Sequence, residues 1–124
     1  MLLKYMLKKY NDIKYNCWDF VRDFYKQEFN IELPNFNVKG TGQYKLKYEI
    51  YKQESKNWKK LKKPKMYCVV VLSDVGKADH VGIYLGKGNF IHNTKQANVS
   101  ISNLNKPEWL NNVVGFYEHE KIHY

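Results

Sequence analysis

The sequence predicts a single α+β domain over residues 1–124, with helices in the first part of the chain and strands in the second. Three observations lead to this fold class. The chain has 124 residues, 44% of them hydrophobic, which is enough for one buried core and too little for two. Apolar residues near the N-terminus recur at helical spacing. After residue 66, short runs rich in β-branched and aromatic residues alternate with turn residues.

Two helices are expected within the first thirty residues. The first covers residues 1–10 and caps the core with an apolar stripe of Leu3, Met6, Leu7 and Tyr10. Asn16 is a suitable N-cap for the second helix, whose apolar stripe begins at Cys17 and which continues to about Asn30. The second helix is the best defined in the chain.

A basic segment follows. Residues 39–65 hold ten lysines and two glutamates, so most of the formal charge of +9 lies there. Tyr44, Tyr48, Tyr51, Ser55 and Trp58 keep a helical period, which predicts a basic amphipathic helix closed by Pro64. The charge favours an anionic partner such as nucleic acid, cell-wall polymer or lipid headgroups. Arg22 is the one arginine, and base readout depends on arginine, so sequence-specific nucleic-acid recognition is disfavoured.

The second half of the chain predicts an antiparallel sheet. The expected strands are 67–72, 81–85, 90–93, 99–101 and 113–117. The turns between them are short, which favours a meander on which the helices pack.

The two cysteines, Cys17 and Cys68, are too few for a disulfide scaffold, and we expect both to be reduced. Lysines interrupt the N-terminal apolar residues, so residues 1–10 do not resemble a signal peptide, and no segment has membrane-spanning length. The expectation is a protein that is cytoplasmic at synthesis and reaches its target within a larger assembly.

Cys17 is a candidate nucleophile. A cysteine at a helix start is favoured as thiolate by the unpaired N–H groups and the positive end of the helix dipole. A cysteine on an apolar stripe is, however, more often a small core residue. The nucleophilic role therefore needs a base and a group that orients the base.

His80 and His92 are candidates for those two roles. His80 begins an expected strand and shares a face with Gly82, which would leave room for the helix start that carries Cys17. A three-residue loop over 86–88 would pair Leu85 with Asn89 and Gly82 with His92, placing both imidazoles on one face. A two-residue loop would instead pair Ile83 with His92 and put His92 on the opposite face. Each histidine alone is more often a half-buried residue bonded to backbone.

These residues carry a resemblance to a known family. The segments NCWDFVR (16–22) and FNIELP (29–34) resemble the nucleophile region of NlpC-type cell-wall cysteine peptidases, particularly the phage-tail branch. The segments ADHVGIYLG (78–86) and FIH (90–92) resemble the strand pair that carries the family's base and its orienting residue, and VVGFY (113–117) resembles the closing strand. The resemblance covers about residues 10–117.

The resemblance implies a papain-like fold in which Cys17 attacks a peptide carbonyl, His80 transfers the proton and His92 orients His80. It implies peptidoglycan stem peptides as substrate, commonly cut at a bond involving D-glutamate, with phage tail proteins as possible partners and no cofactor. It also implies a tyrosine that supports the oxyanion. Tyr10 is the first choice for that role, with Tyr5 and Tyr15 as alternatives.

One rival motif is present. The segment from His119 to His123 fits H-E-x-x-H, the zinc metallopeptidase helix. That chemistry needs a helix and a third ligand downstream, whereas residues 113–117 predict a strand and only Tyr124 follows His123. We therefore expect no metal site and interpret the motif as a polar C-terminal tail.

The function expected from these observations is a cysteine endopeptidase of peptidoglycan that belongs to a phage or phage-like tail. One alternative is a catalytically idle tail-assembly or plug protein that keeps the fold for packing. Another is a lysine-rich polyanion-binding protein that uses the segment 39–65.

Overall fold

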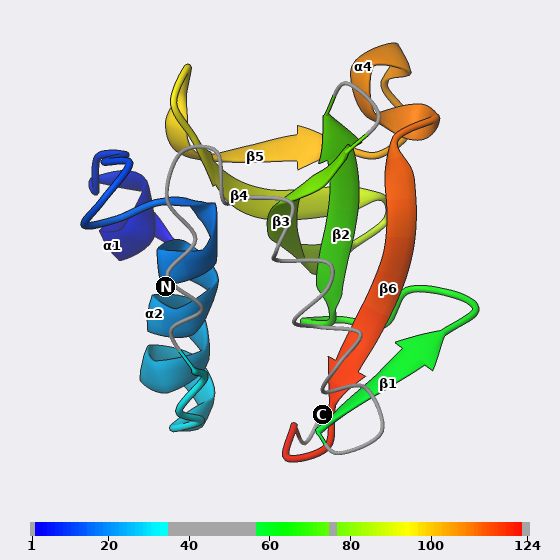
Figure 1. Cartoon of the computed structure of the whole chain (residues 1–124), viewed down its shortest axis with the longest axis horizontal. Helices are drawn as coiled ribbons and strands as arrows, with labels where there is room; N and C mark the ends of the chain where they lie inside the picture. The colour runs from blue at the N-terminus through cyan, green and yellow to red at the C-terminus, as the bar shows by residue number, and fades with distance from the viewer. Residues whose placement is uncertain (1, 35–56, 75–76, 123–124) are drawn as a thin grey trace.

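A computed structural model describes residues 2–34, 57–74 and 77–122 of the chain. These residues form an α+β domain in which α1 and α2 stand on one side of an antiparallel sheet (Figure 1). The predicted fold class is confirmed for this part of the chain. Residues 44–56 of the predicted basic helix lie outside it. Within the described ranges, no helix is both long enough and apolar enough to span a bilayer.

Helix α2 (Cys17–Phe29) has the bounds that the sequence predicted. Asn30 ends it in the left-handed conformation, with φ of 54°. Aromatic side chains on the buried face of α2, Phe20, Phe24 and Tyr25, are fully enclosed and pack against the sheet. This one face supplies much of the core between helix and sheet.

Helix α1 (Leu3–Met6) is shorter than predicted and turns a different face inward. Tyr5 is buried and packs against Phe24 with the rings tilted by 40°, whereas Leu3 and Leu7 are exposed. The expected stripe was therefore wrong. Tyr5 is fixed in the core by ring contacts and by a 2.5 Å hydrogen bond from its hydroxyl to Glu28, and a four-residue helix can present only one such anchor.

The sheet has six strands in the order β1-β6-β2-β3-β4-β5. Their bounds are Trp58–Leu61 (β1), Val69–Asp74 (β2), Lys77–Gly86 (β3), Asn89–Thr94 (β4), Asn98–Asn103 (β5) and Val113–His119 (β6). Strands β2 to β5 form the predicted meander, but β6 returns to the far side of β2 and β1 pairs with β6. The predicted helical period through Trp58 was wrong at its end, because Trp58 starts β1 opposite His119.

The β3–β4 hairpin combines both loops that the sequence allowed. Gly86 pairs with Asn89, so the loop has two residues, and the predicted Leu85–Asn89 pair is absent from this ladder. A β-bulge at Leu85 then adds one residue to β3 and restores the pairing of Gly82 with His92. Lys87 and Gly88 have positive φ, 54° and 83°, as a tight two-residue turn requires.

The sequence did not predict the short helix α4 (Pro107–Leu110), which connects β5 to β6. It lies at the start of β6, whereas β1 lies beside the other end of that strand (Figure 1). Its Trp109 packs with Phe90, Leu72 and Val70 in a second, smaller core. That second core lies on the face of the sheet opposite α2. Successive side chains along a strand point to opposite faces, and Val70 and Leu72 of the second core alternate along β2 with Val69 and Val71, which pack with α2. The residues of β3 that pack with α2 are Val81 and Ile83.

Candidate active site

The start of α2 is held by a capping box. The side chain of Asn16 accepts hydrogen bonds from the backbone N–H groups of Trp18 and Asp19, at 3.1 and 3.0 Å. The carboxylate of Asp19 accepts the backbone N–H of Asn16 at 3.0 Å. These bonds fix Cys17 as the first residue of the helix, as the sequence predicted.

Cys17 is 3% exposed and belongs to the core that α2 forms with β3 and β4. Tyr10 is near it. The pKa of the Tyr10 hydroxyl is raised well above its usual range by burial, by a hydrogen bond with Asp12, and by the negative charge of a Cys17 thiolate. A raised pKa keeps this hydroxyl protonated, and therefore a hydrogen-bond donor, at neutral pH.

The two alternative tyrosines are engaged with carboxylates of α2. The hydroxyl of Tyr5 donates to Glu28 at 2.5 Å, and that of Tyr15 donates to Asp23 at 2.6 Å. Tyr10 is also engaged with a carboxylate, that of Asp12, but of the three tyrosines it is the one whose pKa is raised in part by the charge of Cys17.

The two histidines are in direct contact. Nε2 of His80 lies 2.7 Å from Nδ1 of His92, and the ring centroids are 5.0 Å apart. Nε2 of His92 lies 2.8 Å from the hydroxyl oxygen of Ser102 on β5. The predicted sharing of one face by His80 and His92 is confirmed. Ser102 was not predicted as part of this cluster, because a serine in a strand carries no recognisable signal of such a role.

The role predicted for Gly82 was wrong. A Cβ atom at Gly82 would lie 2.8 Å from the Phe90 ring and 3.0 Å from Cβ of His92, both on β4. The missing side chain therefore makes room for the residues across the hairpin, not for the start of α2. It allows Phe90 and His92 to lie flat against β3.

Aromatic rings enclose the imidazole pair. Trp109 stacks on His80, with centroids 6.0 Å apart and planes 25° apart, and meets His92 edge-on at 5.1 Å. Phe90 lies 4.3 Å from the His92 ring on the same face. Pro107 at the first position of α4 was a usable signal for that helix, but the stacking of its tryptophan on His80 depends on tertiary packing.

Burial keeps both imidazoles neutral. It lowers the pKa of His80, and it lowers the pKa of His92 together with the neighbouring charge that a protonated His80 would carry. A neutral imidazole has a lone pair on one ring nitrogen, which a general base needs. Since Nε2 of His80 faces His92, Nδ1 is the nitrogen that His80 can use to accept a proton.

Asn93 connects the start of α2 to the strand that carries His92. It is fully buried, and its Nδ2 donates to the backbone carbonyls of Tyr15 and Asn16, at 2.8 and 3.3 Å. The residue before Cys17 is therefore bonded to the residue after His92. The structure thus brings the two imidazoles together and joins the start of α2 to β4.

The H-E-x-x-H segment does not form the helix that a zinc site of this type requires. His119 ends β6, residues 120–122 form no helix, and His123 lies outside the described residues. The His119 ring is buried edge-on against Trp58, with centroids 4.8 Å apart. His119 thus packs in the core. Among the described residues no group of three metal-ligating side chains occurs.

Comparison with known proteins agrees with this arrangement. The model of the NlpC/P60 family matches residues 4–118. Murein DD-endopeptidase MepS/Murein LD-carboxypeptidase of Escherichia coli K12, and the proteins of that name in strains O6:H1 and O157:H7, are each 27% identical to this chain over 95 residues. The alignment covers 76% of this chain and 44% of each relative, so the chain spans less than half the length of these relatives. Because the family match runs from α1 into β6, this chain belongs to the NlpC/P60 family.

Proposed function

We propose that this domain is a cysteine peptidase that hydrolyses peptide bonds in the stem peptides of peptidoglycan. The observation that carries the proposal is the 2.7 Å contact between His80 on β3 and His92 on β4, together with the hydrogen bonds by which Asn93 joins β4 to the start of α2. Family membership supports a peptidoglycan hydrolase, and the names of the Escherichia coli relatives refer to murein peptidase activities.

The proposed reaction begins with proton transfer from the Cys17 thiol to Nδ1 of His80. The thiolate attacks the carbonyl carbon of the substrate, and the Tyr10 hydroxyl donates a hydrogen bond to the oxygen that becomes negative. His80 then gives its proton to the leaving amine, which leaves a thioester on Cys17. A water molecule, deprotonated by His80, hydrolyses the thioester and restores the thiol.

In this scheme His92 orients His80. The contact between His92 Nδ1 and His80 Nε2 fixes the plane of the His80 ring and accepts its Nε2–H. When His80 becomes an imidazolium, this acceptor stabilises it.

Mass spectrometry of digested peptidoglycan tests the proposal. Purified peptidoglycan is incubated with wild-type protein and with Cys17→Ala, each with and without EDTA. We expect new peptide termini with wild type only, unaffected by the chelator, and the masses identify the bond. No cleavage by wild type, or equal cleavage by Cys17→Ala, would overturn the proposal and favour a catalytically idle protein.

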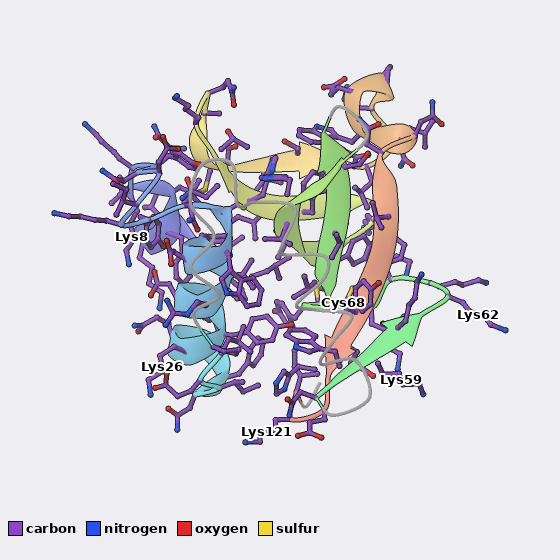
Figure 2. The ribbon with its side chains drawn as sticks, in the orientation of Figure 1. Lys8, Lys26, Lys59, Lys62, Cys68 and Lys121 are labelled. Carbon is purple, nitrogen blue, oxygen red and sulfur yellow. The ribbon has the colours of Figure 1, made fainter. Side chains whose placement is uncertain are left out.

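A second candidate function is attachment to an anionic wall polymer through β1. Basic side chains on the helical side form ion pairs with carboxylates: Lys4 with Glu28, Lys8 with Asp23, Arg22 with Asp19 and Lys26 with Glu32. On the edge strand β1 and the turn after it, Lys59, Lys62 and Lys63 are exposed, and none forms an ion pair with a carboxylate in the described part of the chain. Figure 2 shows Lys59 and Lys62 on the side of the molecule away from Lys8 and Lys26.

Two triple variants test this attachment. Lys59, Lys62 and Lys63 are changed together to Gln, and the control changes Lys4, Lys9 and Lys26 to Gln, which removes the same charge from the helical side. We expect the β1 variant alone to lose salt-sensitive binding to wall fragments while cleaving a small soluble peptide normally. Equal loss in both variants, or binding to nucleic acid rather than to wall polymer, would contradict wall attachment.

Attachment to a phage or phage-like tail is a further prediction, drawn from the sequence resemblance and not supported by the relatives. Detection of the protein in purified phage or phage-like particles by mass spectrometry would support it. Its absence from such particles would contradict it.

A further inference from the structure

The hydroxyl of Ser102 ends a chain of hydrogen bonds that starts at His80. Ser102 lies on β5, and its oxygen is 2.8 Å from Nε2 of His92. Nδ1 of His92 is 2.7 Å from Nε2 of His80. Each imidazole thus uses a nitrogen to face the next group, and three side chains from three neighbouring strands are connected in series.

The position of one proton decides whether His80 can act as a base. A neutral imidazole carries a proton on one nitrogen and a lone pair on the other. If Ser102 accepts a hydrogen bond, His92 carries its proton on Nε2, its Nδ1 accepts from His80, and His80 has a free lone pair on Nδ1. If Ser102 donates, both bonds reverse and Nδ1 of His80 carries a proton, so it cannot take one from a thiol.

Nearby side chains limit the alternatives to Ser102. His92 is 1% exposed, with Phe90 and Trp109 against its ring. Burial lowers the pKa of both imidazoles, so the pair is neutral near pH 7 and the choice of tautomer is set by its neighbours. Loss of the Ser102 hydroxyl would leave a buried ring nitrogen without this partner.

We propose that Ser102 is a positioning residue that holds the proton of His92 on Nε2 and thereby keeps His80 in the tautomer that can accept a proton on Nδ1. This inference rests on the proposed peptidase function for its consequence in catalysis. The tautomer itself is a property of the folded protein and is measurable without substrate.

The test compares three variants of the full chain. Ser102→Ala removes the hydroxyl, Ser102→Thr keeps it, and Ser100→Ala is the matched control. Ser100 lies on the same face of β5 and pairs directly with His92 in the ladder, yet the hydroxyl bonded to the His92 ring is that of Ser102. We expect Ser102→Ala to lower kcat about tenfold to a hundredfold, with smaller effects on KM. Ser102→Thr and Ser100→Ala should stay within about threefold of wild type.

Nitrogen-15 NMR of the histidine rings provides the second measurement, since protonated and unprotonated ring nitrogens have distinct shifts. In wild type at pH 7 we expect His92 to be protonated on Nε2 and His80 on Nε2. In Ser102→Ala, we expect a mixture of tautomers at both rings. Protonation of His92 on Nδ1 in wild type would overturn the inference even if Ser102→Ala failed to fold. Unchanged kcat and unchanged tautomers in Ser102→Ala would also overturn it, as would equal losses in Ser100→Ala.

These outcomes separate the two proposals. If wild type does not cleave peptidoglycan, the proposed function fails, while the NMR result still decides whether Ser102 sets the tautomer. If wild type cleaves and Ser102→Ala is indistinguishable from it by both measurements, the inference about Ser102 fails alone.

Discussion

Asn93→Ala should separate the start of α2 from β4 and thereby affect catalysis more than stability. The substitution removes two hydrogen bonds from a fully buried amide to the carbonyls of Tyr15 and Asn16. At about 0.5–1.5 kcal/mol net for each bond, the expected loss of unfolding free energy is about 1–3 kcal/mol. The Oδ1 atom of Asn93 is buried without a hydrogen-bond partner among the described residues, and its removal offsets part of this cost.

The assay measures thermal unfolding and turnover on the same protein samples. A loss of about 1–3 kcal/mol corresponds to a fall in Tm of very roughly 4–12 °C for a domain of this size. At 25 °C the variant should stay mostly folded, yet kcat should fall about a hundredfold, since a displacement near 1 Å of a reacting group has that effect.

Asn103→Ala is the matched control. Asn103 lies at the other end of the β4–β5 ladder, where its Nδ2 donates to Asn89 and to the carbonyl of Lys87, at 2.9 and 3.3 Å. It loses these two bonds far from Cys17, together with the bond that its Oδ1 accepts from the backbone N–H of Asn105 at 2.9 Å. Its stability should therefore fall while its kcat at 25 °C stays near wild type. An unchanged kcat in Asn93→Ala, or an equal fall in Asn103→Ala, would refute the idea that Asn93 places Cys17 relative to the histidines.

Three further predictions concern the cysteines and histidines. His80→Ala should lower turnover about 10²- to 10⁴-fold, whereas His92→Asn should retain partial activity because an amide carbonyl can accept the His80 N–H. The turnover of His92→Ala should lie between these two. A fully active His92→Ala would contradict the orienting role of His92. Native Cys17 should be alkylated much faster than Cys68, because Cys68 is fully buried and burial raises its pKa to about 11. Mass spectrometry of the labelled protein measures both rates, and equal labelling of the two cysteines would argue against a reactive Cys17. Burial lowers the pKa of His80, His92 and His119, so the unfolded chain binds more protons than the folded chain below about pH 6.5. The unfolding free energy, measured in urea, should therefore fall as the pH decreases from about 7 to 4. An unfolding free energy that does not change over this range would contradict neutral buried imidazoles.

The parts of the fold that local sequence determines were predictable. Helix α2 is specified by its own capping box and apolar face, so the sequence predicted both of its ends. Strands β2 to β5 are joined by short turns, so their antiparallel order followed from sequence distance alone. In these segments each signal and its structural consequence lie within a few residues.

The parts that depend on distant contacts were not predictable in this way. Strand β6 pairs with β2 across more than forty residues, and β1 is a strand because β6 offers it an edge, against the helical period that ends at Trp58. Trp109 stacks on His80 from a helix in another loop. Pairing and stacking of this kind depend on tertiary packing, which overrides local preference.

The pairing of the two histidines depends on a local feature of the β3–β4 hairpin, the β-bulge at Leu85. Continuing the pairing of Gly86 with Asn89 along a regular ladder would place Ile83 opposite His92 and turn the imidazole to the α2 side of the sheet. The bulge at Leu85 adds one residue to β3, so His92 returns to the face of His80, where Ser102, Phe90 and Trp109 surround it. Gly86 adopts φ of 96° beside this bulge, a conformation that residues with side chains rarely take. The hydrogen-bonded histidine pair therefore depends on the backbone freedom of Gly86, six residues away from both His80 and His92.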